Sequence, residues 1–406
     1  MLLGVLGSAS VGIATAAPVA AESVRTFYIS ASGDDANAGN SPATAWRTLR
    51  PASSGVLAGD TVLLEGGSTF VGPLSLDSRD TGVTVGSFGT GRARILGQGA
   101  SGVMGYDVGG ITIRDLDLVG DAAAFASDGG VNLYSDEPAG RRLSGVTIDH
   151  VTASGFKNGV EIGGANPGAG FGQVLISDVT ANGNRDAGVI TYGPAFNPST
   201  PSYANSNVRV VRTTANRNLG NAADNLHNSG NGIVLGSVDG GSILSSTARG
   251  NGTLCVAPEG PVGIWTYDSR GIRIAHNTST GNRTGGDADG DGFDLDQNVS
   301  DSSLEHNTST GNDGAGYLVY AGQDNATTGN VVRWNSSEGD AGNNSWYGGI
   351  TLAGEVHSVT VTGNTVDTTT SASHAPALAI KSGVTAAKIS KNTLRSAAGY
   401  RVIARS

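Results

Sequence analysis

The sequence predicts an all-β protein, a right-handed parallel β-helix that forms one solenoid domain with an N-terminal cap. From about Val146 onward, a short apolar strand recurs at steps of 28 to 34 residues, and near-fixed periods of this size indicate a solenoid. Each period contains two alternating strands separated by Asn, Gly, Thr and Ser turns instead of a helical stripe. The 64 glycines and the 5% share of aromatic residues also favour a thin core with many turns.

The N-terminal residues are small and apolar. We expect residues 1–21 to be a secretory signal peptide with a small-x-small cleavage site at Val19-Ala20-Ala21, which predicts a secreted, extracellular protein. Residues 22–406 are then the β-helix domain, with a cap and first coil over 22–60 and stacked coils over 61–406. The segment from Trp46 to Leu49 is expected to cover the open end of the stack.

The first strand of each coil carries one apolar marker residue. Asparagine follows three residues after each of the last five markers, and stacked amides can bond one another between coils, so we expect a structural ladder. The markers are Ile148, Ile176, Val210, Leu244, Ile274, Leu304, Val332, Val361 and Ile389, and the asparagines are Asn277, Asn307, Asn335, Asn364 and Asn392.

The second strand of each coil carries the informative variation. Its first and third positions are nearly all apolar and are expected to face the core, so the second and fourth positions face outward. These outward positions collect acids and aromatic residues on one face of the stack, where rings can pack on sugar faces while acids supply the chemistry. They are Glu161, Tyr192, Trp265, Tyr267, Asp294, Asp296, Tyr320 and Lys381.

The acidic pair Asp294 and Asp296 is the candidate catalytic centre. Two residues apart on one strand face, their Cα atoms are roughly 6.5–7 Å apart, a spacing that suits a glycosidase acid and base. Asp291 would tune or assist them. We expect the substrate contacts to be Trp265, Tyr267, Tyr320, Glu161, Tyr192, Asp268 and Lys381.

A calcium loop is the rival interpretation of the same segment. Asp287, Asp289 and Asp291 alternate before Gly292, as in oxygen-ligand loops of the D-x-D-x-D-G type, although Asn298 stands where the bidentate Glu is expected. Catalytic acids, bound Ca²⁺ and a solvated acidic turn all remain open. No cofactor is required by the hydrolytic interpretation, and Ca²⁺ is possible.

The composition excludes several partners. With a formal net charge of −10, the chain lacks the basic surface that nucleic acids require, so we expect no nucleic-acid partner. Nothing after the first segment is apolar enough to span a bilayer, and we expect no membrane partner. The single cysteine, Cys255, rules out an internal disulfide and is expected to be buried.

The chain resembles the pectate-lyase-like superfamily of secreted bacterial β-helix proteins that act on carbohydrate. The opening from Phe27 to Gly39, then Trp46 to Leu49, looks like the cap of those proteins, and the segment from Gly263 to Tyr317 is similar to a recurrent pattern in them. This resemblance implies the fold and a polysaccharide or oligosaccharide substrate. It does not imply one reaction, because the superfamily contains hydrolases, lyases and epimerases.

Three functional classes follow. A glycoside hydrolase is favoured, because lyases of this superfamily rely on an Arg or Lys base and basic contacts to uronates, whereas the expected face is acidic. A polysaccharide lyase or uronate epimerase is the alternative, kept open by Lys381 and by Arg270 or Arg283 nearby, and a non-catalytic glycan-binding β-helix is the third class. Loops 193–207 and 218–231, the latter with His227, are expected to wall the cleft.

Overall fold

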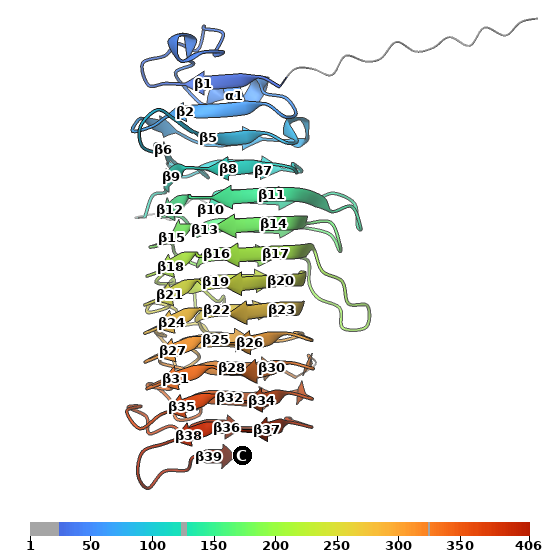
Figure 1. The fold of residues 1–406 in the computed structure, drawn as a ribbon, viewed down its shortest axis with the longest axis vertical. Coiled ribbons are helices and arrows are strands. Elements are labelled where there is room, and N and C mark those ends of the chain that lie inside the picture. The colour runs from blue at the N-terminus through green and yellow to red at the C-terminus, as the bar shows by residue number, and fades with distance from the viewer. Residues whose placement is uncertain (1–23, 123–127, 324) are drawn as a thin grey trace, which may run out of the picture.

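The computed structural model describes residues 24–122, 128–323 and 325–406, so the expected signal peptide lies outside the described residues. The described chain is a parallel β-helix with three long parallel sheets running its length, as predicted (Figure 1). Within these ranges, no helix is long and apolar enough to cross a membrane.

Each coil contributes a strand to three sheets, named A, B and C in chain order. Within the described residues, sheet A has 13 strands and sheets B and C have 12 each. Sheet A contains β1 (Thr26–Ile29), β2 (Thr61–Glu65), β5 (Thr84–Phe88), β8 (Thr112–Arg114), β11 (Leu143–Asp149), β14 (Phe171–Ser177), β17 (Asn205–Val211), β20 (Val238–Leu244), β23 (Arg270–Ala275), β26 (Ser303–Glu305), β30 (Val331–Arg333), β34 (Thr360–Thr362) and β37 (Lys388–Ser390).

Sheets B and C are built from shorter and longer strands respectively. Sheet B contains β3 (Thr69–Val71), β6 (Ala93–Leu96), β9 (Leu116–Val119), β12 (Thr152–Ser154), β15 (Thr180–Ala181), β18 (Thr214–Asn216), β21 (Thr247–Arg249), β24 (Thr278–Thr280), β27 (Thr308–Thr310), β31 (Ser336–Glu338), β35 (Thr365–Asp367) and β38 (Thr393–Arg395). Sheet C contains β4 (Leu74–Leu76), β7 (Val103–Tyr106), β10 (Gly129–Ser135), β13 (Asn158–Gly164), β16 (Ala187–Tyr192), β19 (Asn231–Gly236), β22 (Val262–Tyr267), β25 (Asp291–Leu295), β28 (Tyr317–Ala321), β32 (Ile350–Gly354), β36 (Leu378–Ile380) and β39 (Ile403–Arg405).

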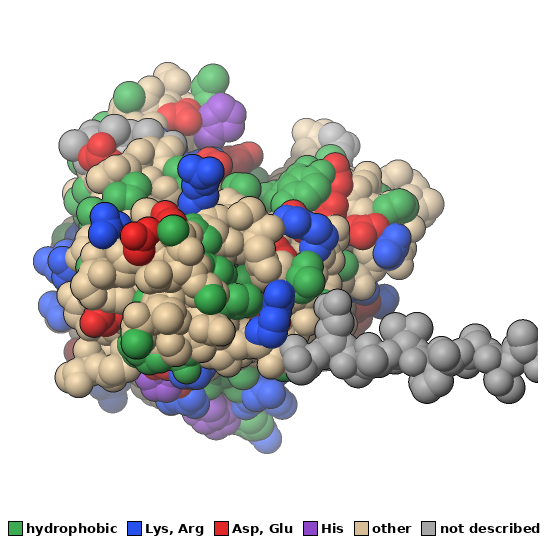
Figure 2. Space-filling model, turned by 90° about the horizontal axis from the view of Figure 1, so that it is seen from above, with side chains coloured by type: hydrophobic (Ala, Val, Ile, Leu, Met, Phe, Trp, Pro, Cys, Tyr) green, Lys and Arg blue, Asp and Glu red, His purple; other side chains and the backbone are tan. Residues whose placement is uncertain are grey.

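The N-terminal end of the stack is covered by the first described residues. Trp46 stacks on Phe27 with ring centroids 4.6 Å apart, and both rings are buried. The short helix α1 (Arg50–Gly55) buries Ala52 beside β4, and one-turn helices cover Pro42–Thr44 and Ser78–Asp80. Seen from this end, the surface mixes polar, charged and scattered apolar side chains (Figure 2). A two-stranded sheet, β29 (Thr327–Thr328) with β33 (Val356–His357), completes the elements.

The core is a single thin column of side chains enclosed by the three sheets. The first and third positions of the sheet C strands point into it as predicted, and Phe293 and Leu295 are fully buried. The marker expected at Leu244 is wrong by one residue, because Val210 pairs with Ile243 and Leu244 faces outward. Ile243 and Leu244 are both apolar, so alternation by itself could not choose between them.

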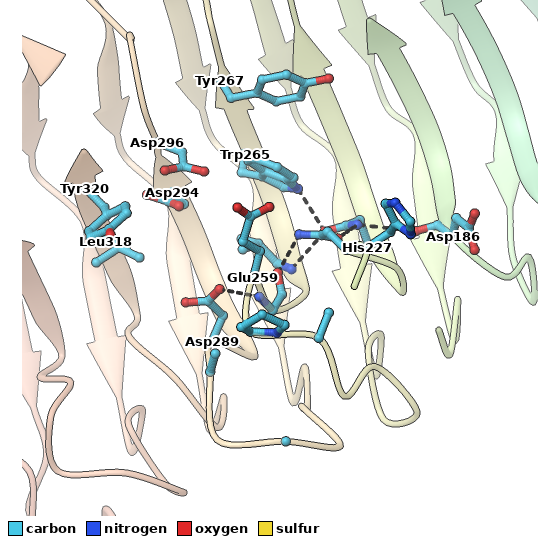
Figure 3. Close-up of a pocket in the computed structure, with 18 of the residues that line it drawn as sticks. Asp186, His227, Glu259, Trp265, Tyr267, Asp289, Asp294, Asp296, Leu318 and Tyr320 are labelled. Carbon is cyan, nitrogen blue, oxygen red and sulfur yellow. Dashed lines mark hydrogen bonds between the residues drawn. The ribbon is translucent and has the colours of Figure 1, made fainter. Parts of the chain in front are cut away.

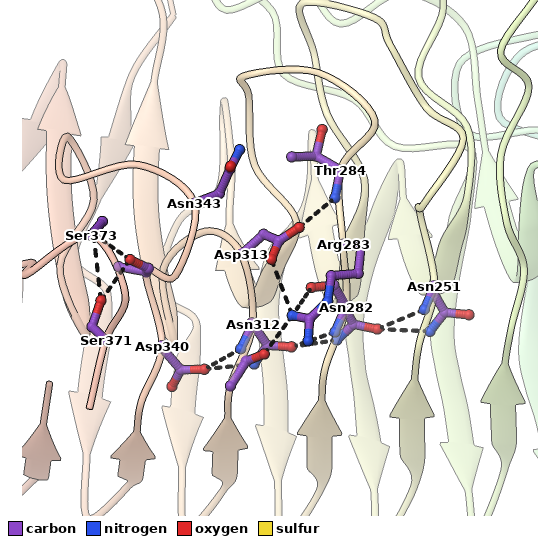
Figure 4. Close-up of polar contacts among 12 residues, drawn as sticks. Asn251, Asn282, Arg283, Thr284, Asn312, Asp313, Asp340, Asn343, Ser371 and Ser373 are labelled. Carbon is purple, nitrogen blue, oxygen red and sulfur yellow. Dashed lines mark hydrogen bonds and ion pairs between the residues drawn. The ribbon is translucent and has the colours of Figure 1, made fainter.

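Asparagine ladders satisfy the turns between the sheets. The predicted ladder is present at the turn from sheet A to sheet B, where each amide oxygen accepts from the backbone of the coil before. A second ladder lies at the turn from sheet B to sheet C and ends at the buried carboxyl of Asp340 (Figure 4). Its amides are Asn184, Asn218, Asn251, Asn282 and Asn312. Cys255 is buried, as expected.

Candidate active site

The outward face of sheet C forms the floor of a cavity of about 1570 Å³. Its floor runs across β13, β16, β19, β22, β25 and β28, and loops that precede the sheet C strands form one wall (Figure 3). The expected wall at 218–231 is present through Asp224, His227 and Asn228. The wall expected at 193–207 is wrong, because that loop follows β16 and leads to sheet A, so none of its residues lines the cavity.

Asp294 and Asp296 both lie in this cavity, on the same strand end (Figure 3). The strand register around Asp294 agrees with the predicted stacking of the coils. Asp294 pairs with Trp265 on one neighbouring strand and with Leu318 on the other. β25 ends at Leu295, yet the amide of Asp296 still donates to the Thr266 carbonyl oxygen at 3.0 Å. The fold thus holds both acids by backbone pairing to the same neighbouring strand.

The two carboxyls sit in different environments. Asp294 is 3% exposed and its Oδ1 has no hydrogen-bond partner within the described structure. Burial, together with the charge of Asp296, raises the pKa of Asp294 well above its usual range. Asp296 is partly exposed, its Oδ1 accepts from the Gln297 amide at 2.7 Å, and burial raises its pKa to about 8. Both groups therefore hold protons far more strongly than ordinary aspartates.

Asp291 lies in the interior, beneath the cavity floor. Its side chain is fully buried, does not line the cavity, and occupies the space that a Cβ on Gly314 would need. Burial, with the neighbouring Asp289 charge second, raises the pKa of Asp291 well above its usual range. Asp291 does not reach the cavity, but its expected tuning of the acid pair is consistent with the structure, since its charge, after burial and the charge of Asp296, raises the pKa of Asp294. The two-residue alternation itself accounts for this placement, because Asp291 lies on the same inward side of β25 as Phe293 and Leu295.

The predicted calcium loop does not fit the geometry. Asp289 is already engaged, since its Oδ1 accepts from the Tyr347 hydroxyl at 2.9 Å and its Oδ2 accepts from the Gly260 amide at 2.8 Å. Asp291 is buried away from Asp287, which lines the cavity. Among the described residues, the acid and histidine side chains close enough to share an ion are Asp149, His150 and Asp178, on another turn. Asp289 thus links its own loop, before β25, by hydrogen bonds to the loops before β22 and β32.

Aromatic side chains form much of the cavity floor. Trp265 is 8% exposed, and its Nε1 donates to Asn231 Oδ1 at 3.0 Å. The ring of Tyr267 lies 5.2 Å from the ring of Trp265, and Tyr192 and Tyr320 line the cavity on either side along the strand stack. These four predicted aromatic contacts are brought together with the acid pair.

Three other predicted contact residues have separate outcomes. Glu161 lines the cavity, accepts from Asn158 Nδ2 at 2.8 Å, and has its pKa raised by burial. Asp268 does not line the cavity: it turns away at a left-handed residue and accepts from Asn298. Lys381 does not line it either, but its Nζ lies 5.1 Å from the ring of Trp346, which does.

Sequence reasoning missed the wall residues. Glu259 projects into the cavity from the loop before β22, and Trp346 and Tyr347 enter from the loop before β32 (Figure 3 labels Glu259). At the far end, Arg185 pairs with Asp186 at 2.7 Å. Their place in the sequence could have identified them as wall residues. Each lies in the loop preceding a sheet C strand, and those loops share one side of the stack.

No sequence-family model matches the chain, and no curated protein matches it in sequence. Solved structures do match. A GH136 lacto-N-biosidase from Eubacterium ramulus is similar with a TM-score of 0.63 at 15% identity, over 94% of this chain and 68% of that chain. A variant of DFA-IIIase from Arthrobacter chlorophenolicus, in complex with DFA-III, is similar with a TM-score of 0.50 at 11% identity, over 87% and 80%. The chain therefore shares the parallel β-helix fold of these two proteins.

Proposed function

We propose that this protein is a glycoside hydrolase that cleaves glycosidic bonds in a polysaccharide or oligosaccharide. The observation that carries the proposal is the pair Asp294 and Asp296, held two residues apart in an aromatic-floored cavity, with Asp294 the more deeply buried and the pKa values of both raised. A lacto-N-biosidase of similar fold supports action on carbohydrate. The reaction itself rests on the acids and their surroundings.

The environments of the two carboxyls support one assignment of roles. Asp294 is buried more deeply, its Oδ1 has no partner among the described residues and burial raises its pKa well above the usual range, so it keeps its proton and is the general acid for the leaving oxygen. Asp296, nearer water with a pKa of about 8, loses its proton first and is the base that activates a water molecule. Their Cα separation of roughly 6.5–7 Å suits the carboxyl spacing of an inverting pair. Product formed with inverted anomeric configuration, seen by NMR, is the expected result.

The charges of the cavity favour a substrate without uronates. Eight acids line it, whereas its permanently charged bases are Lys157 and Arg185, and Arg185 is already paired with Asp186. Both bases lie toward β13 and β16, several strands from the acid pair. Once ionised as the base, Asp296 would repel a uronate carboxylate, and the basic group that elimination needs is absent from the immediate floor around the acid pair among the described residues.

Digestion of a glycan panel tests the proposal. We expect new reducing ends without the absorbance of an unsaturated product, and a rate reduced on the order of 10²–10⁴ by Asp294→Asn or Asp296→Asn. Asp301→Asn, an exposed aspartate outside the cavity, is the matched control and should keep the parental rate. Unsaturated product would establish a lyase, and binding without product would establish a glycan-binding protein. Near-parental rates in both cavity variants would refute the assignment of the acids.

A further inference from the structure

A line of tyrosines runs along sheet C and passes through the cavity. In the strand register, Tyr106 pairs with Tyr134, Tyr134 with Gly163, and Gly163 with Tyr192. The same outward position continues as Gly236 paired with Tyr267, and the next coil places Asp296 there. The line therefore leads directly to the proposed base.

The rings of Tyr192 and Tyr267 lie flat on the cavity floor because the residue paired with each on the preceding strand is glycine. A Cβ added to Gly163 would overlap the ring of Tyr192, and one added to Gly236 would overlap the ring of Tyr267. Each ring thus covers the preceding coil and turns its opposite face outward. Any side chain larger than glycine at these two positions would lift the ring from the floor.

The line extends beyond the cavity. Tyr106 and Tyr134 do not line it, yet their ring centroids are 6.0 Å apart and Tyr106 is 43% exposed. A hydrogen bond to Asp136 holds the Tyr106 hydroxyl and, as the largest cause, raises its pKa to about 12. An exposed, fixed aromatic pair continuous with a binding cavity is the kind of surface that binds the flat faces of sugars.

We propose that these residues, the tyrosine track formed by Tyr106, Tyr134, Tyr192 and Tyr267, bind a glycan chain that lies parallel to the solenoid axis. This inference rests on the proposed function and names its substrate as a chain rather than a disaccharide. Six strand steps separate Tyr106 from Asp296. At about 4.8 Å a step, close to the length of one pyranose unit, the track spans roughly six sugar units. Tyr106 and Tyr134 then form a remote subsite that short substrates do not reach.

The test compares chain lengths. Oligosaccharides of roughly two to ten units, prepared from the polysaccharide that the wild-type protein degrades, are assayed with wild type, Tyr106→Ala and the double variant Tyr106→Ala/Tyr134→Ala. We expect kcat/KM for the longest chains to fall about five- to tenfold in the variants, through KM, because ring-face burial is lost. Chains shorter than about four units should be unaffected, since they end before Tyr134. Trp334→Ala, an equally exposed ring at the turn from sheet A to sheet B, is the matched control.

The outcomes separate the two proposals. Unchanged long-chain kcat/KM in both variants, or an equal fall for short and long chains, overturns the track. If the wild-type protein degrades no glycan, the hydrolase proposal fails, and the track is then tested by electrophoretic retardation in gels that contain each polysaccharide of the panel. Retardation that Tyr106→Ala weakens and Trp334→Ala preserves supports the track by itself. No retardation in any gel overturns it as well.

Discussion

Replacing Asp296 by asparagine should make the protein more stable while making it inactive. An aspartate has a pKa of about 3.9 in an unfolded chain, whereas burial raises the pKa of Asp296 to about 8 in the folded protein. The folded state therefore binds a proton that the unfolded state has released at neutral pH. This difference destabilises the wild-type fold, and asparagine removes it because it carries no ionisable proton.

The pH dependence of this effect has a defined sign. Below about pH 4 both states are protonated and the variant gains nothing. As pH rises toward 8, the wild type loses stability relative to Asp296→Asn, and above 8 the difference stays constant. Between the unfolded pKa of about 4 and pH 7, the stability difference grows over about three pH units at 1.36 kcal/mol each, which gives an upper value of about 4 kcal/mol at pH 7. Because Asp296 is partly exposed, we expect roughly 2–4 kcal/mol.

Equilibrium guanidinium unfolding at several pH values between 4 and 8 measures the effect. Asparagine keeps the volume and the oxygen that accepts from the Gln297 amide, so the local backbone should not change. Asp301→Asn supplies the control for the substitution itself. A stability difference that does not vary with pH, or a variant less stable than wild type at pH 8, would show that the cavity does not oppose ionisation of this carboxyl.

Four further results are expected. The kcat/KM of the wild type should rise with pH up to about 8 as Asp296 ionises, and a profile that instead falls over this range would reverse the acid and base roles. Gly236→Ala should lift the Tyr267 ring and raise KM about three- to tenfold, with little change in melting temperature. Gly55→Ala is the control: the space around Gly55 is open, so this variant should change neither KM nor melting temperature. Asn282→Ala should lower the free energy of unfolding by about 3 kcal/mol, measured by denaturant titration, because it leaves the buried backbone amide of Asn251 without an acceptor and removes the side-chain hydrogen bonds to Asn251 and Asn312. A loss below about 1 kcal/mol would contradict a structural ladder. A chelator should leave the calorimetric melting temperature unchanged, and a drop restored by calcium would revive the calcium loop.

The solenoid could be predicted from the sequence because its restraints are local. A strand step, an inward and outward alternation and a turn recur in every coil, so the pairing of Trp265 with Asp294 follows from counting along the chain. Counting failed where the local pattern was ambiguous. Two adjacent apolar residues, Ile243 and Leu244, allowed a one-residue error that the neighbouring strands resolve.

The candidate site was predictable only in part. The sequence by itself determined the outward column of acids and rings, since period-two alternation fixes which side of a strand each residue faces. The tertiary structure decided what encloses that column. Glu259, Trp346 and Tyr347 reach the cavity from loops of different coils. Loop paths and burial depend on contacts between coils, which no local pattern encodes, and the same contacts set the environments that raise the pKa values of the two acids.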